Sequence, residues 1–300
     1  MHLSNCKIVS NLNYTSNEFG MDCYEKCLDK FLFENYEKNI SYCFNSRGFR
    51  DEEWPKSSED LQQSIWCLGE SFTMGIGSPI EYTWPKSLQN LLSIRTINVS
   101  LDGASNTWIH RKALDILKHV KPVNMVIAWT FIGRDEDPNS LLLDEQRKLD
   151  FNWKQNKIKF NFLFEKLLVQ IKEIEQIKGS CNIVHMFVPS FDYGYTKEYI
   201  NKEIKDLYNL LKGKSWPNLC ENFYIPEFVK KELIEYDAYE NLVNLLLLKK
   251  ERMKFDDYIQ KLQIVEYQVL DTARDGFHFD IITANDIAQK CQVFIRKQTS

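Results

Sequence analysis

Short apolar runs alternate with helical stretches through the middle of this chain. The runs cover residues 64–68, 95–99, 124–129 and 181–188, and they have the β-branched, bounded character of buried strands. Helical periodicity marks residues 79–92, 105–119 and 141–177 between them. Strands separated by helices form right-handed crossovers, so the pattern predicts an α/β fold with a parallel sheet and helices on both faces.

The chain reads as one such domain with two additions. Its 300 residues are 44% hydrophobic, which supplies a full core and excludes a disordered protein. No repeat or linker divides it, so we expect an N-terminal extension over 1–61, packed on the core of a single domain over 62–300. That domain carries an amphipathic helical insertion at about 230–265 and ends in a helix over 281–297 that starts near Thr283.

Charge and composition limit the kinds of partner that the protein is expected to bind. Lys and Arg total 38 against 42 Asp and Glu, a net charge of -4, so we expect no nucleic-acid partner. No signal peptide and no apolar stretch of membrane-spanning length is visible, which predicts a cytoplasmic protein without a membrane partner. The eight cysteines form no CxxC pair, so we expect no metal and no cofactor. The oligomeric state stays open.

A serine follows the first expected strand. The strand ends at Gly69 and Ser71 comes two residues later. Ligand sites of open α/β folds form at the carboxyl ends of the strands, so Ser71 stands where a nucleophile would act. A helix N-cap is the alternative, because serine after a strand commonly caps a helix.

Asp275 and His278 supply the other groups that an active serine needs. A serine hydroxyl requires an imidazole to take its proton, and the imidazole requires a carboxylate on Nδ1 to fix its tautomer. Of five histidines, only His278 has a carboxylate at such spacing and a helix after it, whereas His185 lies inside an apolar run that favours a buried structural histidine. A structural Asp-Gly turn is the alternative for this segment.

Together these segments resemble the SGNH/GDSL hydrolase superfamily over about residues 62–295, including uncharacterised members from marine bacteria and phages. The first block is similar to Gly69 through Ser71, the glycine of the second block to Gly103, and the final Asp-x-x-His to Asp275 through His278. The resemblance implies a three-layer flavodoxin-like sheet of about five parallel strands. It also implies a Ser71, His278 and Asp275 triad, with the amides of Ser71 and Gly103 in the oxyanion hole.

Two positions depart from the superfamily pattern. Glu70 replaces an aspartate, which lengthens the side chain beside Ser71, and we expect this change to leave Ser71 itself untouched. Thr130 stands where the third block has an oxyanion-binding asparagine, so the missing donor would be the Thr130 hydroxyl or the Arg134 guanidinium. An unreplaced donor would cost roughly 3 to 4 kcal/mol of transition-state stabilisation. The alternatives are a plain strand residue at Thr130 and a surface ion pair at Arg134.

Three further side chains are expected to bind substrate: Arg50, Arg134 and Asn106. Arg50 ends an Asn-x-x-Gly-Phe-Arg segment that resembles one found ahead of the nucleophile in some SGNH proteins, and its fork could hold a carboxylate or sugar hydroxyls. A turn with a structural arginine is the alternative. Four tryptophans could form a sugar-stacking wall, although core packing is the better interpretation for most of them: Trp84, Trp108, Trp129 and Trp153.

These observations predict a serine hydrolase that cleaves a small acyl ester, an O-acetyl group on a carbohydrate being the favoured substrate. Two alternatives remain at this point. One is a weakly active or inactive SGNH scaffold used for binding or assembly, because fold does not carry function with it. The other is a lipase or thioesterase, which would differ in the shape of its pocket.

Overall fold

Four parallel strands form the central sheet, in the order β4-β3-β5-β6. The computed structural model describes residues 13–15, 40–131, 157–188, 250, 253–275 and 278–296. The strands are β3 (Ile65–Gly69), β4 (Thr96–Ser100), β5 (Asn124–Trp129) and β6 (Asn182–Phe187), which confirms the four expected positions. A fifth segment extends the sheet beside β6, where His185 and Ile264 form a single parallel bridge. The predicted α/β fold with about five parallel strands is therefore confirmed.

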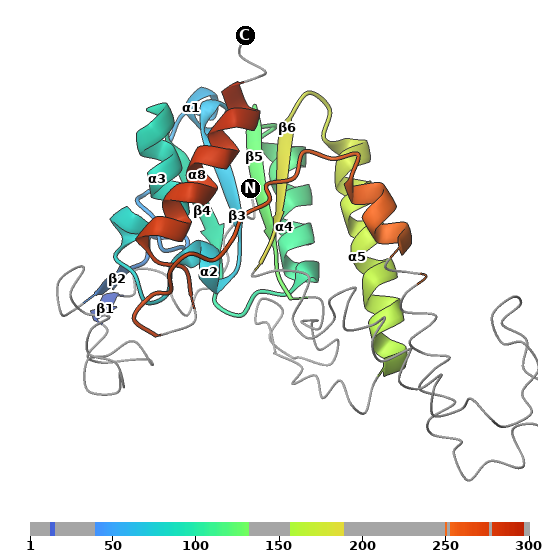
Figure 1. Ribbon diagram of the computed structural model, residues 1–300. Coiled ribbons are helices and arrows are strands. Elements are labelled where there is room, and N and C mark those ends of the chain that lie inside the picture. The colour runs from blue at the N-terminus through green and yellow to red at the C-terminus, as the bar shows by residue number, and fades with distance from the viewer. Residues whose placement is uncertain are drawn as a thin grey trace, which may run out of the picture.

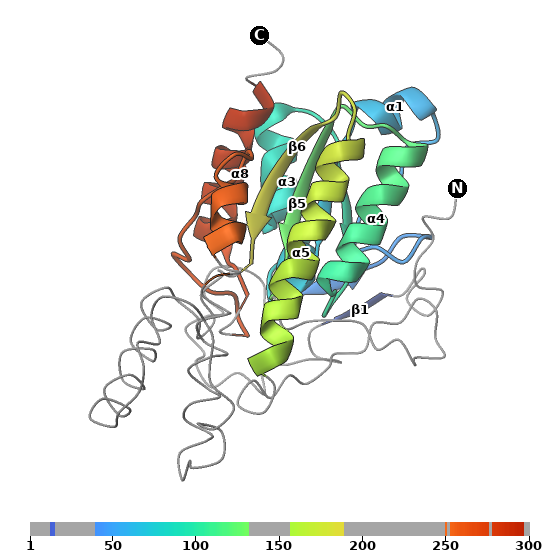
Figure 2. The same ribbon diagram turned by 90° about the vertical axis from the view of Figure 1, so that its right-hand side faces the viewer.

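Helices cover both faces of this sheet (Figures 1 and 2). On one face lie α3 (Trp84–Leu92) and α8 (Ile281–Arg296), and on the other lie α4 (Asn106–His119) and α5 (Lys157–Ile177). Successive strand side chains point to opposite faces, so each strand serves two cores. The core under α3 and α8 contains Ile65, Cys67, Val126 and Val184. The core under α4 and α5 contains Trp66, Leu68, Met125 and Ile127.

The helix ends follow from local sequence. The Ser105 side chain accepts the Trp108 amide at the start of α4, and the Asp271 carboxylate accepts the first amides of α8. The expected helix over 79–92 is divided into η2 (Ile80–Tyr82) and α3, with Pro85 in the first turn of α3. Proline suits that position because it has no amide hydrogen to donate.

The chain before the sheet packs onto the core. Strands β1 (Asn13–Thr15) and β2 (Ser41–Cys43) pair antiparallel, and the short helix α1 (Ser58–Gln63) leads into β3. Between them Phe49 stacks on Trp54, with ring centroids 5.3 Å apart, and Trp54 meets Trp66 of β3 edge-on at 5.1 Å. Residues 40–54 therefore contribute to the same core as α4. The division of the chain at residue 61 stays a prediction.

Several expectations fall partly or wholly outside the described residues. These are the helix over 141–156, most of the insertion at 230–265, Arg134 and Trp153, while residues 253–259 of the insertion are helical. Three of the four tryptophans are buried, since Trp84, Trp108 and Trp129 are at most 1% exposed. They pack in the core and cannot form an exposed sugar-stacking wall. Among the helices that the structure describes, none is long and apolar enough to cross a membrane.

Candidate active site

The site lies at the carboxyl edge of the sheet, where β3 turns into the short helix α2 (Ser71–Met74). Glu70 is the N-cap residue of α2 and Gly75, at φ +80°, ends it. A side chain on Gly69 would place its Cβ 2.0 Å from Thr73 Oγ1. Glycine at this position therefore lets the helix fold back tightly over the end of the strand, which holds Ser71 at the sheet edge.

Ser71, His278 and Asp275 lie in one line of hydrogen bonds. His278 Nε2 is 2.8 Å from Ser71 Oγ, and His278 Nδ1 bonds to Asp275 Oδ2. The other oxygen, Asp275 Oδ1, accepts the backbone amide of His278 at 3.0 Å. Both carboxylate oxygens of Asp275 thus bind the same residue, which fixes the ring and its tautomer relative to the serine. Ser71 is 1% exposed and His278 is 8% exposed.

Contacts from three directions hold the loop that carries His278. The Ala273 amide donates to the His278 carbonyl at 2.8 Å, and the Arg274 amide donates to the Gly77 carbonyl at 3.4 Å. The Phe72 ring packs on the imidazole, with ring centroids 4.5 Å apart. Because Phe72 follows Ser71 in α2, this short helix both carries the serine and supports the His278 ring.

The longer side chain of Glu70 contacts the serine directly. Ser71 Oγ lies 2.6 Å from Glu70 Oε2, and Glu70 Oε1 accepts the Phe72 amide at 3.3 Å. Glu70 is fully buried. Burial raises the pKa of the Tyr267 hydroxyl well above its usual value, and the negative charge of Glu70 adds to that rise. The one signal in the sequence is the extra methylene of glutamate, which gives the carboxylate the reach to turn back onto Ser71.

The candidate oxyanion donors have different surroundings. Ser71 is the first residue of α2, so its amide has no carbonyl acceptor within the helix. Gly103 lies at φ +70° in the turn between β4 and α4. Thr130 follows β5 and is 5% exposed, and its amide donates to Asn106 Oδ1 at 2.9 Å. All three stand beyond the carboxyl ends of β3, β4 or β5, and their part in an oxyanion hole stays a prediction.

Two residues expected to bind substrate are occupied by the protein itself. Asn106 Nδ2 donates to the Thr130 carbonyl at 3.1 Å, so this side chain ties the start of α4 to the end of β5. Arg50 is fully buried, and its guanidinium donates to backbone carbonyls of the segment after α2, including Ser78 at 2.9 Å, and of Ser41 at 3.1 Å. The Arg50 contacts support the turn behind Ser71, and the part of both residues in substrate binding stays a prediction.

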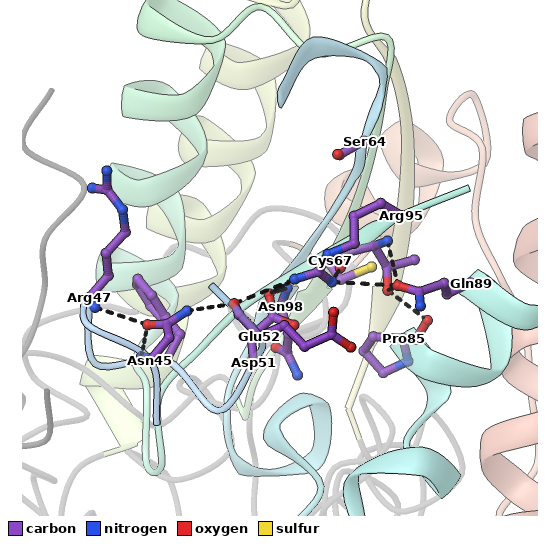
Figure 3. A network of polar contacts seen from close by, with 12 residues as sticks. Asn45, Arg47, Asp51, Glu52, Ser64, Cys67, Pro85, Gln89, Arg95 and Asn98 are labelled. Atoms are coloured by element: carbon purple, nitrogen blue, oxygen red, sulfur yellow. Dashed lines mark hydrogen bonds and ion pairs between the residues drawn. The ribbon is translucent and has the colours of Figure 1, made fainter. Parts of the chain in front are cut away.

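The buried carboxylate of Asp51, in the N-terminal extension, supports helix α2 through a chain of hydrogen bonds (Figure 3). Asp51 Oδ2 accepts from Arg95 Nη2 at 2.9 Å and from the Asn98 amide at 3.2 Å. Asn98 Nδ2 in turn donates to the Thr73 carbonyl at 3.1 Å, at the base of α2. Burial raises the pKa of Asp51 from 3.8 to about 6, although the Arg95 charge opposes the rise.

A second histidine, on β6, binds a carboxylate of α5. Trp129 Nε1 lies 3.0 Å from His185 Nδ1, and His185 Nε2 lies 3.2 Å from Glu175 Oε1. An indole nitrogen only donates, so His185 Nδ1 is the acceptor and Nε2 carries the hydrogen that Glu175 receives. His185 is fully buried and both of its ring nitrogens are bonded, as expected for a structural histidine.

Comparison with known proteins gives structural similarity alone. No family model and no curated protein matches the sequence. Similar solved structures include a member of the lipolytic protein G-D-S-L family from Veillonella parvula, at 10% identity and a TM-score of 0.38 over 77% of this chain and 96% of that one. Another is the psychrotrophic esterase EstA from Pseudoalteromonas sp., at 13% identity and a TM-score of 0.38 over 79% of this chain and 98% of that one.

A third similar structure is a carbohydrate esterase family 2 enzyme with a carbohydrate-binding domain from Corynascus thermopiles, at 10% identity and a TM-score of 0.40 over 83% of this chain and 69% of that one. Two of these neighbours are described as esterases and one as a lipolytic protein. In the part of the chain that the structure describes, no group of three or more His, Cys, Asp or Glu side chains is placed to hold a metal ion.

Proposed function

We propose that the protein is a serine hydrolase that cleaves a small acyl ester through Ser71, His278 and Asp275. The observation that carries the proposal is the continuous contact from Ser71 Oγ to His278 Nε2, at 2.8 Å, and from His278 Nδ1 to Asp275. This is the geometry in which an imidazole can take the proton of a serine hydroxyl.

In the first half of the reaction, Ser71 Oγ attacks the acyl carbon as its proton passes to His278 Nε2. The new C–O bond pushes the carbonyl electron pair onto oxygen, and the amides of Ser71 and Gly103 receive that charge, helped by Thr130 or Arg134. When the carbonyl re-forms, the bond to the alcohol breaks and His278 returns the proton to the departing oxygen. Asp275 keeps the imidazolium oriented throughout.

The second half repeats these steps with water. His278 removes a proton from a water molecule, the hydroxide attacks the acyl carbon, and the proton finally returns to Ser71 Oγ as the acid leaves. Each half begins with a neutral His278 and ends with one. No electrons are gained or lost, so the cycle requires no redox partner.

We further propose that the acyl group is short, with an O-acetyl group on a carbohydrate as the favoured substrate. The burial of Ser71 and His278, at 1% and 8% exposure, supports this, because an acetyl group needs less room at the serine than a long acyl chain. Hydrolysis of 4-nitrophenyl acetate and of acetylated xylan, with 4-nitrophenyl palmitate untouched, is the expected pattern. A preference for palmitate would instead favour a lipase or thioesterase.

The decisive experiment uses a fluorophosphonate probe together with 4-nitrophenyl acetate. The unmodified protein should be labelled and should release 4-nitrophenol, and Ser71→Ala should lose both activities. Ser87→Ala is the matched control, because Ser87 is also a buried serine but lies on α3. Equal rates for Ser71→Ala and the unmodified protein would overturn the proposal.

One observation favours a second candidate, a binding or assembly protein on a hydrolase scaffold. Thr130 occupies the position of the asparagine donor, and its backbone is already bonded to Asn106. If nothing replaces that donor, turnover would fall by about 10²-fold or more. This candidate predicts a folded protein that the fluorophosphonate does not label.

A further inference from the structure

We propose that Arg50 is a positioning residue of the active site, which keeps Ser71 and His278 together by holding the segment that links α2 to the loop of His278. The inference rests on the proposed function and gives the N-terminal extension a part in it. Arg50 lies in that extension and is fully buried. The contacts that carry the inference go to backbone carbonyls, so Arg50 acts through the main chain and not on a reacting atom.

Helix α2, which carries the serine, is too short to hold its own end. It has four residues, Ser71–Met74, and isolated helices of fewer than about 12 residues are only marginally stable. The carbonyl groups in the last turn of a helix also have no amide partner within it. Arg50 Nη1 donates to the Met74 carbonyl at 3.2 Å and to the Gly75 carbonyl. The end of α2 therefore depends on a side chain that comes 24 residues earlier in the chain.

Arg50 holds both ends of a bridging segment, residues 74–78, which follows the serine. Nη1 binds the first two carbonyls of the segment, while Nη2 donates to the last one, that of Ser78, at 2.9 Å. Nη2 also donates to the Ser41 carbonyl of β2 at 3.1 Å, which anchors the guanidinium in the extension. A planar guanidinium can serve carbonyls on several sides, whereas a lysine ammonium is a compact charge with three donors. The shape of the bridging segment therefore depends on the arginine.

The bridging segment also contacts the loop that carries the candidate base. The Gly77 carbonyl accepts the Arg274 amide at 3.4 Å, and the Ser78 hydroxyl lies 3.2 Å from the Phe279 carbonyl, to which it donates. Gly77 has φ +81°, and a Cβ at this position would lie 3.3 Å from Asp275 Oδ1. The main chain of the segment thus packs beside the carboxylate that orients the imidazole. Arg50 therefore acts on the serine helix and on the loop of the base at once.

This arrangement makes the rate of the reaction depend on Arg50. A general base has to lie within about 2.6 to 3.2 Å of the atom whose proton it takes. Ser71 Oγ lies 2.8 Å from His278 Nε2, inside that range. A misplacement of about 1 Å can cost about 10²-fold in rate. Loss of the Arg50 contacts should therefore lower kcat and leave the affinity for the ester in place.

The test is the kinetics of Arg50→Lys with 4-nitrophenyl acetate. The lysine keeps the positive charge but cannot reach both ends of the bridging segment, so kcat should fall by about 10- to 100-fold. KM should stay within about twofold, because the interaction that is lost serves the reacting geometry and not the bound ester. A raised KM with an unchanged kcat would show that Arg50 binds substrate and would overturn the proposal, as would two unchanged constants.

Two control variants separate positioning from a general loss of stability. Arg47→Lys lies in the same extension, where the Arg47 guanidinium packs 4.8 Å from the ring centroid of Trp54, and should leave both constants unchanged. Ile116→Ala, in the core under α4, should lower the thermal melt but change kcat by less than about twofold at temperatures below the melt. A loss of kcat in Ile116→Ala as large as in Arg50→Lys would overturn the proposal.

Ser78→Ala gives the same test with a smaller change, should Arg50→Lys fail to fold. It removes the hydroxyl that joins the bridging segment to the Phe279 carbonyl and leaves the Arg50 contacts with the backbone in place. We expect kcat to fall by about fivefold, the equivalent of one hydrogen bond, with KM unchanged. An unchanged kcat in this variant would overturn the link between the bridging segment and the base.

A readout without turnover separates this inference from the proposed function. In hydrogen–deuterium exchange measured by mass spectrometry, the peptides that contain Ser71 and His278 should both exchange faster in Arg50→Lys than in the unmodified protein, and the β5 peptide should not. Faster exchange of both peptides in a protein that hydrolyses nothing would uphold the hold of Arg50 on both groups and defeat the hydrolase. Hydrolysis with unchanged exchange and unchanged kcat would uphold the hydrolase and defeat the positioning role.

Discussion

Two buried histidines are each bonded to a carboxylate, one at the carboxyl edge of the sheet and one on the face that α4 and α5 cover, and only the first faces a hydroxyl. His278 binds Asp275 through Nδ1 and faces the Ser71 hydroxyl through Nε2. His185 binds Glu175 through Nε2 and receives the Trp129 indole on Nδ1. Each imidazole has a carboxylate partner, so the difference lies in the third group, which is the Ser71 hydroxyl for His278 and the Trp129 indole for His185.

That third group decides what the imidazole can do. A hydroxyl both donates and accepts, so the proton between Ser71 and His278 has two places to reside. An indole only donates, so the lone pair of His185 Nδ1 is permanently occupied and its proton stays on the side of Glu175. A buried histidine with a carboxylate partner therefore identifies a catalytic base only when its other nitrogen meets a group that can exchange a proton.

The largest contrast should appear when each carboxylate is made neutral. Asp275→Asn leaves the geometry in place but favours the wrong tautomer of His278, and kcat for 4-nitrophenyl acetate should fall by about 10⁴-fold. Glu175→Gln should change kcat by less than about twofold, because His185 touches no reacting atom. Stopped-flow and steady-state assays of the two variants check this. A comparable loss in both would show that the two pairs are not functionally distinct.

Another carboxylate, Asp51, is buried and extends the comparison, because its partner is a guanidinium. Its pKa is raised from 3.8 to about 6, so the folded state binds the proton more tightly than the unfolded chain. Proton binding by Asp51 therefore stabilises the fold fully below pH 3.8. This stabilisation is lost as the pH rises to about 6, which lowers the free energy of unfolding by about 3 kcal/mol. Urea titrations from pH 4 to 7 should show that the free energy of unfolding depends less steeply on pH in Asp51→Asn than in the unmodified protein. The control is Asp257→Asn, at an exposed site, which should match the unmodified protein.

Removing the indole donor of Trp129 from His185 should lower the free energy of unfolding and leave the activity unchanged. Trp129→Phe leaves His185 Nδ1 buried without its donor, at a cost of about 2 kcal/mol. The free energy of unfolding in urea measures this loss, and fluorophosphonate labelling of Ser71 should be unchanged. A protein that keeps its stability would show that another donor reaches Nδ1.

The smallest expected effect on stability concerns Glu175, the carboxylate partner of His185. Burial alone would raise the pKa of Glu175, but hydrogen bonds from His185 and Lys178 outweigh it and hold the pKa below 4.5. A lowered pKa stabilises the fold above pH 4.5 and the benefit fades as the pH falls through the folded value. Glu175→Gln should therefore lose about 1 kcal/mol at pH 7 and less at pH 3, which urea titrations at both values would reveal.

Much of this architecture could be predicted from the sequence, because buried strands and amphipathic helices leave periodic patterns. The four strands appeared as bounded apolar runs, and parallel pairing brought the segment around Ser71 to a known edge of the sheet. His278 stood out because few histidines compete with it. Each of these predictions depends on local sequence and on one general rule of chain topology.

The missed features depend on side-chain conformation and on strand register. Nothing in the spacing of Glu70 and Ser71 states which way the longer carboxylate turns. The pairing of Trp129 with His185 exists because β5 and β6 align Ile127 with His185, which puts the indole within reach on the same face. Arg50 and Asn106 looked available for substrate because a sequence does not show which backbone carbonyls will be left for a side chain to bind.

The distance along the chain between Ser71 and His278 also has a consequence for biosynthesis. The hydroxyl and the imidazole are 207 residues apart, and the loop that carries His278 is held by contacts with Gly77 and Phe72. A ribosome adds roughly 5 to 20 residues per second, so the serine emerges at least about ten seconds before its base. Under the proposed function, Ser71 is an ordinary unreactive alcohol during that time, and a nascent or truncated chain would not acylate itself on cellular esters.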